Sequence, residues 1–533
     1  MNKISKITPI LIVIILLLFL FLNCLTFIIS KSPTYDEPSY ISSGFIYLKE
    51  ADMNWNTEHP PLIKELLALP LLFMKVWNPF DDLNIKKEVG IWLFAEQFFS
   101  GNDFHKIVIA SRITVVFLSI ILGIYLFLWS REIWGDWGGL LSIFLYCFCP
   151  NILAHSSIAT LDLGTTCFSF IYFYYLYQLL KNQKIIFTLP AGILLGLALL
   201  SKFSSILLIA ITIVLMILWY FYEFSRERFK TVPYITSKTI CNFVKKPLFF
   251  LISSFAIIIL LSIFIIIINY GLIFHQFSLM PYWNGIKNLS NILKKTEFYF
   301  LSKTSYEGWY SFYIITYLIK TPLPTICLLI ASIVFIIKKK LISFDTLFPV
   351  VPIICFFLFP SITKFSVGYR YILPAIPFIF VLIGIIASDK PLLNKIPIRI
   401  ALIGLLILYL INFKMNAPDY LSYFNELVGG PKNGYKYLVD SNLDWGQDLP
   451  GLKQFMNEKI IDFIYLDYFG SINPELYEIN YKPIPEDNLL EGIYAISATY
   501  LQGLFVHNKH KYDKFKKITP INTIGNSIFI YKI

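Results

Sequence analysis

Long apolar runs, separated by short polar segments, fill most of the chain before residue 414. The hydrocarbon core of a bilayer is about 30 Å thick, and a helix needs about 20 mostly apolar residues to cross it. Divided by that length, the pattern predicts a mainly α, polytopic membrane protein with about eleven transmembrane helices. The predicted spans lie near residues 8–29, 106–130, 138–154, 158–180, 185–200, 203–222, 247–270, 313–337, 345–361, 371–388 and 397–413.

Basic residues between the predicted spans indicate an orientation. With the N-terminus in the cytoplasm, most of them fall in inside loops, including clusters at 226–246, 338–340 and 390–399. The short outer connections contain few, Lys202 and Arg370 among them. Cytoplasmic loops carry an excess of Lys and Arg, so we expect this orientation in the inner cell membrane. An odd number of spans then leaves the C-terminus outside the cytoplasm.

The tail, residues 415–533, has a different composition from the part before it. Apolar and polar residues alternate in three runs, at 463–468, 493–499 and 527–531. A period of two is typical of strands, so we predict a small extracytoplasmic α/β domain. The transmembrane domain is then residues 1–414. Its first outer loop, 31–105, is acidic and aromatic, and we expect helices lying in the membrane interface there.

Composition narrows the class of protein. The 533 residues are 56% hydrophobic, 17% aromatic and only 15% charged. Because charged residues make up about a quarter of a soluble domain, a soluble enzyme or a disordered chain is excluded. The net charge of +11 would suggest nucleic acid in a soluble protein. Here loops between apolar spans account for the cations, so we expect membrane lipids and no nucleic acid as partners.

Nucleotide-binding motifs are absent from the sequence. There is no G-x-x-x-x-G-K-[ST] run, and no G-x-G-x-x-G follows a predicted strand. An enzyme whose polar loops face away from the cytoplasm cannot rely on nucleotide substrates. Any group that it transfers must therefore arrive on a membrane carrier.

Acidic residues of the first outer loop are candidates for catalysis. Asp36 and Glu37 follow the first predicted span directly. A carboxylate that is partly desolvated at a membrane surface has a raised pKa and can deprotonate an acceptor hydroxyl. A solvated loop cap is the alternative. Glu58 and His59 precede two prolines. The prolines forbid a helix before them and can begin one after them, so we expect Glu58 and His59 at the N-terminus of a helix. The N-terminus of a helix attracts anions.

Ionisable residues near the outer ends of later spans are candidates for substrate binding. Asp162 lies just inside an apolar stretch, where a charged side chain is costly and marks a functional site. The alternative is that Asp162 caps the N-terminus of a helix. Arg112, Lys202 and Arg370 could hold a phosphate, or they could extend along the membrane interface with no such role. Lys320 precedes a Pro-rich helix start, and we expect it at the surface.

These residues belong to short motifs that, taken in order, resemble glycosyltransferase family 39. That family includes protein O-mannosyltransferases and the bacterial aminoarabinose transferases that modify lipid A. The resemblance covers most of residues 1–413. Its motifs are Asp36-Glu37, Glu58-His59-Pro60-Pro61-Leu62, Ala159-Thr160-Leu161-Asp162, Leu200-Ser201-Lys202-Phe203, Gly308-Trp309-Tyr310, Lys320-Thr321-Pro322-Leu323 and Gly368-Tyr369-Arg370-Tyr371-Ile372-Leu373-Pro374. The segment from Tyr423-Phe424-Asn425-Glu426 to Asp444-Trp445-Gly446-Gln447-Asp448 also resembles the tail of bacterial members, which indicates a prokaryotic envelope enzyme.

The resemblance implies a C-type glycosyltransferase, a helical membrane enzyme that uses a polyprenyl-phosphate-linked sugar on the extracytoplasmic face. The acceptor would be a hydroxyl of a protein, a lipid or a glycan. Asp36 takes the family role of catalytic base, with Glu37 beside it. The leaving group is a lipid phosphate, whose charge needs cations more than it needs a general acid. The predicted substrate-binding residues are Glu58, His59, Arg112, Asp162, Lys202 and Arg370.

Metal binding has two candidate positions. Some family members have a divalent metal near this site, and Glu58 and His59 are the plausible local ligands. Two consecutive residues do not easily reach one ion, so we assign no cofactor and keep a divalent metal near Glu58 as an alternative. Residues 440–448 space their oxygens like a calcium loop, but the glycine is one place late and Gly451 replaces the bidentate Glu. Asx turns and a helix cap are the favoured explanation there.

Two other functions fit the same pattern of spans. A transporter or a flippase for lipid-linked sugars would place ionisable residues near the membrane midplane in two similar halves. The predicted spans are almost free of charge at their centres, and no such repeat is visible, which favours the transferase. A non-catalytic envelope assembly protein is the third alternative, and the presence of Asp36, Glu37 and Arg370 together argues against it.

Overall fold

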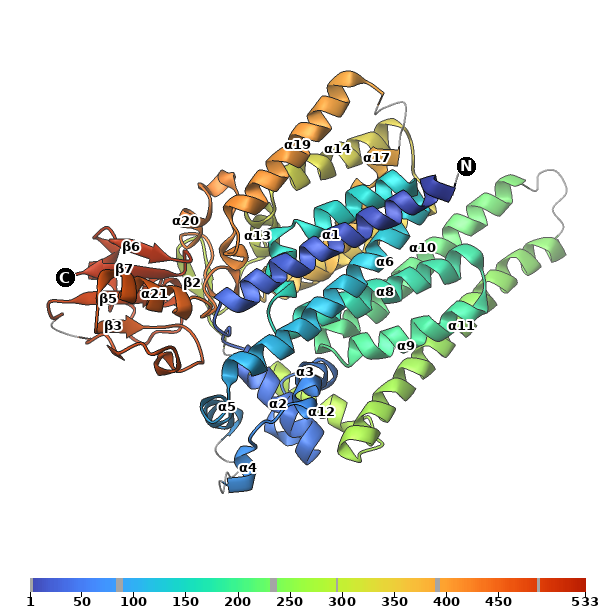
Figure 1. The fold of residues 1–533 in the computed structure, drawn as a ribbon. Helices are drawn as coiled ribbons and strands as arrows, with labels where there is room; N and C mark the ends of the chain where they lie inside the picture. The colour runs from blue at the N-terminus through green and yellow to red at the C-terminus, as the bar shows by residue number, and fades with distance from the viewer. Residues whose placement is uncertain (1–2, 83–89, 231–236, 294–295, 389–393, 487–488) are drawn as a thin grey trace.

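The computed structural model describes residues 3–82, 90–230, 237–293, 296–388, 394–486 and 489–533. Helices make up most of the chain before residue 416, and a small sheet lies in the tail (Figure 1). Lys390, one of the basic residues that indicated the orientation, lies outside the described residues.

Six of the described helices are long and apolar enough to cross a membrane, and a bent pair of helices is a seventh candidate. The chain is therefore an integral membrane protein, although the predicted number of spans is not confirmed. The six are α1 (Lys3–Ser30), α6 (Phe104–Cys147), α10 (Leu207–Lys230), α11 (Ser237–Phe274), α15 (Phe344–Ile362) and α19 (Ile396–Met415).

The other predicted spans correspond to joined or shorter helices. The two spans predicted on either side of residue 135 are joined in α6, whose backbone leaves the helical conformation at Gly135 (φ 76°). The short α7 (Pro150–Ser156) follows α6. The helix α8 (Leu161–Asn182) has 22 residues and packs against α6 and α9 (Thr188–Leu199) inside the bundle. The shorter helices are α9, α16 (Ile376–Ile383) and α17 (Ile385–Ser388).

The bent pair replaces the single span that we predicted at 313–337. The chain bends by 113° between α13 (Phe312–Lys320) and α14 (Leu323–Lys338). Pro322 has no N–H to continue the first helix, and it disfavours the helical conformation for the residue before it. Thr321 is accordingly extended (φ −95°, ψ 134°). The bend places Lys320 inside the protein.

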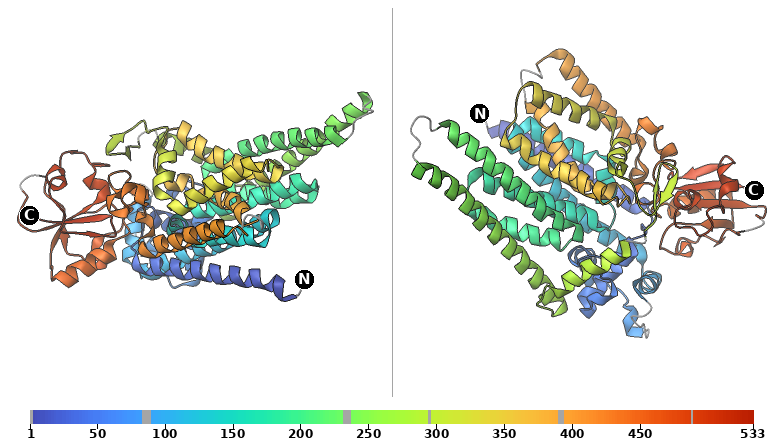
Figure 2. Two further views of the ribbon diagram at one scale, coloured as in Figure 1. Left: turned by 90° about the horizontal axis from the view of Figure 1, so that it is seen from above. Right: turned by 180° about the vertical axis from the view of Figure 1, so that it is seen from behind.

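Short elements cover one end of the bundle, beside the tail (Figures 1 and 2). The opposite end holds the N-terminal ends of α1 and α19 and the C-terminal end of α10. The predicted outer segments and several of the predicted inside loops therefore lie at opposite ends. The short elements are α2 (Glu37–Glu50), α3 (Leu62–Ala68), α4 (Pro79–Asp82), α5 (Gly90–Ser100), α12 (Met280–Leu293), β1 (Phe298–Phe300) and β2 (Lys303–Ser305).

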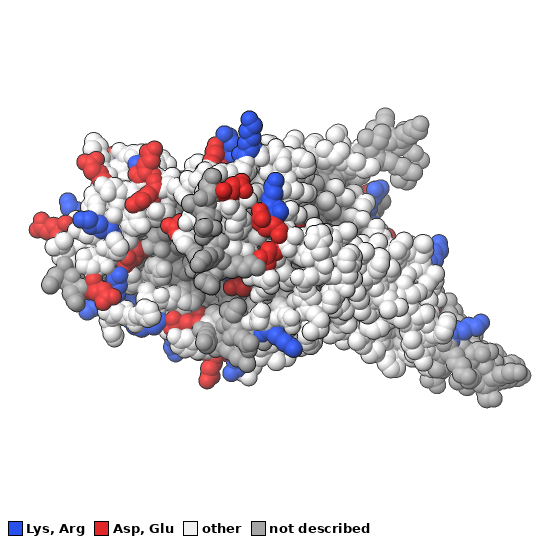
Figure 3. All heavy atoms as spheres, turned by 90° about the horizontal axis from the view of Figure 1, so that it is seen from below, with Lys and Arg blue, Asp and Glu red and all other residues white. Residues whose placement is uncertain are grey.

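The distribution of charge follows the same axis. On the face drawn in Figure 3, charged side chains gather at the end that holds the tail. A broad band without charged residues separates them from a few basic side chains towards the other end. A band of this kind is what a bilayer core requires.

The tail contains a five-stranded sheet in the order β4-β3-β5-β7-β6. Strand β3 pairs in parallel with β4 and β5, and β7 pairs antiparallel with β5 and β6. The three alternating runs in the sequence coincide with β3, β5 and β7. The strands are β3 (Ile464–Asp467), β4 (Tyr481–Lys482), β5 (Ile493–Ser497), β6 (Asn522–Ile524) and β7 (Ile528–Lys532), and the helices are α20 (Pro431–Gly434), α21 (Leu449–Lys459), α22 (Ala498–Leu501) and α23 (Asp513–Lys516).

Candidate active site

A cavity of about 460 Å³ lies between α8, the start of α10, and the end of α15. Much of its wall is apolar, with contributions from Leu207, Leu208, Phe356 and Phe359. Pockets with an apolar wall and a few convergent polar groups are the usual form of a ligand site. The charged residues and the histidine in its wall are His59, Asp162, Lys202, Glu307, Lys364 and Arg370.

The first turn of α8 supplies a carboxylate to this cavity. Asp162, Thr165 and Ser169 all line the cavity, because their spacing places them on one face of the helix. Thr160, and not Asp162, is the N-cap residue. The capping alternative for Asp162 is therefore wrong, and its side chain is free to pair with a cation.

Arg370 links the first outer loop to α8. It lies in a short 3-10 turn (Tyr369–Tyr371), and its Nη1 donates a hydrogen bond to Asp36 Oδ2 at 2.8 Å. The same nitrogen is 4.0 Å from Asp162 Oδ2. Asp36 is the N-cap residue of α2, and the Asp36 side chain is 21% exposed. The predicted catalytic base thus contacts the predicted phosphate ligand, which lines the cavity, although the two come from distant parts of the sequence.

Lys202 completes a chain of alternating charges. Its Nζ donates to Asp162 Oδ1 at 2.6 Å and lies 4.2 Å from the centre of the Tyr371 ring. Lys202 is extended and buried between α9 and α10. Asp36, Arg370, Asp162 and Lys202 therefore follow one another in contact. Each cation faces at least one carboxylate, so an anionic ligand would enter by competing with these carboxylates.

Three buried polar atoms in the cavity wall have no hydrogen-bond partner among the described residues. They are His59 Nδ1, Ser205 Oγ and Arg370 Nε. Buried polar groups in native proteins almost always have partners, so these three atoms are available to a ligand or to water in the cavity. Arg370 therefore keeps hydrogen-bonding capacity in addition to its ion pair with Asp36.

Glu37 and Arg112 form a separate, buried pair. Both side chains are 0% exposed, and Arg112 Nε and Nη2 donate to the two Glu37 carboxylate oxygens at 2.8 Å. The remaining Arg112 donors bind carbonyl oxygens at the end of α1, and Glu37 also accepts from two backbone N–H groups. The structure therefore brings neither residue into the cavity. Arg112 has no donor left for a phosphate, and Glu37 is a structural neighbour of Asp36.

Glu58 and His59 have different surroundings, although they are adjacent. Glu58 is exposed, whereas His59 is partly buried and lines the cavity. Burial, and then the charges of Lys202 and Lys64, hold the pKa of the His59 imidazole well below its usual value. No group of three or more His, Cys, Asp or Glu among the described residues could hold a metal ion. A divalent metal near Glu58 stays a prediction.

Lys320 is not at the surface as we expected. Its side chain is 1% exposed, and its Nζ donates to Leu421 O at 2.8 Å and to Asn442 O. The same nitrogen lies 4.7 Å from the centre of the Phe424 ring. The expectation failed because the bend at Pro322 turns the end of α13 towards the tail, and partners so far along the chain leave no local signal.

Two tail residues that no sequence pattern indicated also reach the site. Trp445 and Asn442 contact Arg370 and its neighbours, and both lie in segment 440–448, which we interpreted as Asx turns and a helix cap. In the structure Asp444 accepts from Thr499 N, and Asp448 pairs with Lys31. The carboxylates of Asp444 and Asp448 are thus bound by groups of the protein itself. The resemblance of this segment to the tails of bacterial family members was the available signal.

Residues 91–240 match the family model described as dolichyl-phosphate-mannose-protein mannosyltransferase. This segment contains Arg112, Asp162 and Lys202, and it confirms the resemblance expected from the motifs over that part of the chain. No curated protein matches the chain.

Solved membrane enzymes are similar over long stretches at low identity. The crystal structure of ArnT from Cupriavidus metallidurans bound to undecaprenyl phosphate matches with 10% sequence identity and a TM-score of 0.49. The match covers 99% of this chain and 98% of that one. The archaeal oligosaccharyltransferase AglB from Archaeoglobus fulgidus, in complex with an inhibitory peptide and a dolichol-phosphate, shows 12% identity and a TM-score of 0.42. That match covers 76% of this chain and 52% of that one.

Proposed function

We propose that this protein is a membrane glycosyltransferase that moves a sugar from a polyprenyl-phosphate-linked donor to a hydroxyl acceptor. The reaction takes place on the extracytoplasmic face of the inner membrane, where α2–α5 and the tail lie. The proposal rests on the position of Arg370, which lies between Asp36 and Asp162 and lines a cavity with a largely apolar wall. The match of residues 91–240 to a mannosyltransferase family model supports the same class of reaction.

The cavity suits the two parts of such a donor. The apolar wall, with Phe356 and Phe359 at the end of a membrane helix, can hold the first part of a prenyl chain. Arg370 and Lys202 can hold the phosphate, because charge-assisted hydrogen bonds to a guanidinium or an ammonium are among the strongest available. The unpaired His59 Nδ1 and Ser205 Oγ offer further hydrogen bonds to a sugar or a phosphate oxygen.

The roles of the charged groups follow from their positions. When the phosphate binds Arg370, it competes with Asp36 for the guanidinium, and the Asp36 carboxylate becomes available to an acceptor. Asp36 then takes the proton of the acceptor hydroxyl as the hydroxyl oxygen bonds to the sugar. The bond from the sugar to the phosphate breaks, and Arg370 and Lys202 stabilise the charge left on the lipid phosphate. Asp162 keeps Lys202 in place through the 2.6 Å contact.

The experiment is transfer of labelled sugar from a panel of polyprenyl-phosphate donors, in membranes holding wild type or Asp36→Asn at matched expression. We expect label in protein, lipid or polysaccharide with wild type and at least a hundredfold less with Asp36→Asn, which is the low end for a general base. The labelled fraction identifies the acceptor class. Full turnover by a folded Asp36→Asn protein would contradict the role of Asp36. Flipping of lipid-linked sugar by reconstituted protein without any transfer would favour the flippase alternative.

A further inference from the structure

The segment 440–448 of the tail touches the side chain of Arg370 directly. The Arg370 guanidinium carbon lies 4.4 Å from the centre of the Trp445 ring, and Trp445 is only 1% exposed. A guanidinium stacked on an indole gains both cation–π attraction and packing. Because the indole is buried on its other sides, it gives Arg370 a fixed wall at this position.

The same segment also holds the backbone on which Arg370 stands. Asn442 is 1% exposed, and its Oδ1 accepts from Tyr369 N at 2.9 Å. Its Nδ2 donates to Val367 O at 3.0 Å. The amide therefore binds the chain on the N-terminal side of Arg370 with both of its polar atoms. Asn442 is itself anchored, because its carbonyl oxygen accepts from the buried Lys320.

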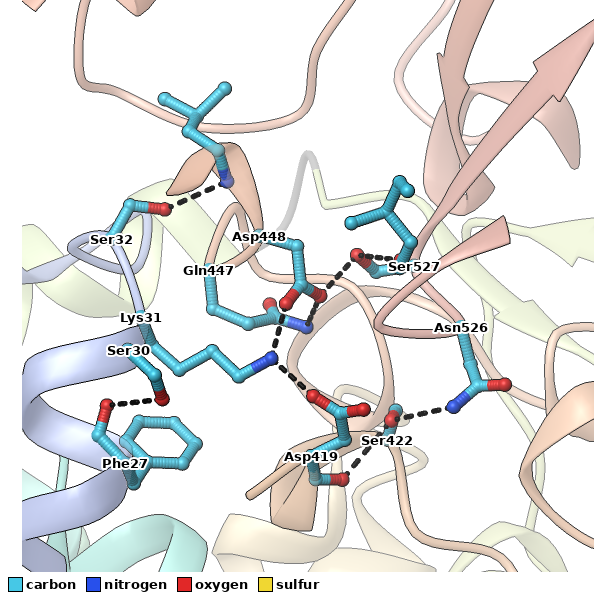
Figure 4. Close-up of polar contacts among 12 residues, drawn as sticks. Phe27, Ser30, Lys31, Ser32, Asp419, Ser422, Gln447, Asp448, Asn526 and Ser527 are labelled. Atoms are coloured by element: carbon cyan, nitrogen blue, oxygen red, sulfur yellow. Dashed lines mark hydrogen bonds and ion pairs between the residues drawn. The ribbon is translucent and has the colours of Figure 1, made fainter. Parts of the chain in front are cut away.

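The loop that carries Asp36 is bound to the next residues of the segment. Tyr35 N donates to Trp445 O at 2.8 Å, and Ser32 N donates to Gln447 O at 3.0 Å. Lys31 reaches from the end of α1 between two tail carboxylates, Asp419 and Asp448 (Figure 4). Burial opposes its charge, but these two carboxylates raise the pKa of Lys31, so the contact is an ion pair at neutral pH.

We propose that Asn442 and Trp445 are positioning residues of the active site, which hold Arg370 so that its free N–H groups face the phosphate of the donor. Asn442 fixes the turn that carries Arg370, and Trp445 fixes the plane of the guanidinium. The tail segment is then part of the catalytic centre, in addition to any part it has in selecting the acceptor. This inference rests on the proposed function, because it takes the ligand of Arg370 to be a lipid phosphate.

The test measures binding of undecaprenyl phosphate to the purified full-length protein in lipid nanodiscs. Trp445→Leu and Asn442→Ala should each weaken binding by about tenfold, as the loss of a desolvated stacking contact or of paired hydrogen bonds predicts. Trp445→Phe keeps a flat ring and should restore most of the affinity. Asn457→Ala, at an exposed asparagine of α21, is the matched control and should bind as wild type does.

A double-mutant cycle separates positioning from general damage. In an Arg370→Ala background, Trp445→Leu should cause no further loss, because the residue that it positions is gone. An equal loss in both backgrounds, or unchanged binding by both Trp445→Leu and Asn442→Ala, would overturn the inference. The melting temperature of each variant is recorded, and Asn442→Ala decides the question if Trp445→Leu does not fold. Wild-type protein that binds no undecaprenyl phosphate would overturn it too.

Binding and transfer distinguish this inference from the proposed function. If wild type transfers sugar from no donor but the binding cycle behaves as expected, the transferase assignment fails and the positioning roles stand. If transfer depends on Asp36 while the two tail variants bind normally, the transferase stands and the positioning roles fail. In transfer assays Trp445→Leu should raise the KM for the donor more than it lowers kcat.

Discussion

The two neighbouring acids at the start of α2 have opposite environments. Asp36 is partly exposed and pairs with Arg370, whereas Glu37 is fully buried and pairs with Arg112. In the sequence the two residues form a single Asp-Glu pair, and nothing in that pair shows which residue is the catalytic base and which is structural. The distinction depends on the helix geometry, which turns Glu37 into the bundle and leaves Asp36 at the cap of α2.

The Glu37–Arg112 pair should matter for stability. Arg112→Met leaves a buried carboxylate without its partner, which costs about 3–5 kcal/mol in comparable cases. We expect a much lower melting temperature for the purified variant. Lys106→Met is the control, because the ion pair of Lys106 with Asp103 is largely exposed to solvent, and this variant should melt close to wild type. An Arg112→Met protein as stable as wild type would contradict the structural role.

The buried carboxyl group of Asp444 should make the stability of the folded protein depend on pH. Burial raises the pKa of its carboxyl to about 7, against 3.8 for a free aspartate, although Thr499 N donates to it. Between these values the unfolded chain releases the proton and the folded chain keeps it. Stability therefore falls as the pH rises through this window, and is level above it. Asp444→Asn keeps an acceptor for Thr499 N and cannot ionise.

The comparison of melting temperatures checks this expectation. Relative to wild type, Asp444→Asn should gain stability as the pH rises from about 4 to about 7, and the difference should stay constant at higher pH. Taking the difference between the two proteins removes the titration of other groups. A constant difference across the whole range would show that Asp444 titrates normally in the folded protein.

At the scale of elements, periodicity predicted which segments are regular but not where the helices break. The three alternating runs of the tail became β3, β5 and β7, and the first apolar run became α1. The span expected at 313–337 is broken at Pro322, and α6 joins two expected spans through Gly135. Hydropathy averages over such points, whereas the backbone of a single residue decides them. The contact of Arg370 with Asp36 has no local signal either.

The bend between α13 and α14 gives Lys320 a function that can be tested. Lys320→Met removes the donor to two tail carbonyls and leaves these acceptors buried, at a cost of about 1–3 kcal/mol. The segment around Leu421 and Asn442 should loosen, so limited proteolysis should cut the tail faster than in wild type. Lys338→Met, at the exposed end of α14, is the control and should leave the cleavage rate unchanged. Equal rates for all three proteins would show that other contacts hold the tail.

For the whole molecule, the candidate site gathers residues from every part of the chain. Asp36 comes from the first loop, Asp162 and Lys202 from the middle of the bundle, Arg370 from a later turn, and Trp445 from the tail. Motif order could predict the first four as a set, because each lies at the expected outer end of a span. It could not predict that the tail contributes to the site, because contacts between the tail and the helical bundle depend on how the two pack together.

The arrangement of the ends makes the orientation of the whole protein testable. The tail lies at one end of the protein, and the N-terminal end of α1 lies at the other (Figure 2). Basic residues at 338–340 belong to the second end, so the positive-inside rule predicts that the tail lies outside the cytoplasm. Alkaline phosphatase fused after Ile533, at the outer edge of the tail, should be active, and a fluorescent protein at the same point should be dark. Fusions ending at Lys339 should give the opposite pair of results. An active phosphatase at Lys339 and an inactive one after Ile533 would invert the topology, and it would then place Asp36 and Arg370 on the cytoplasmic face, within reach of nucleotide sugars.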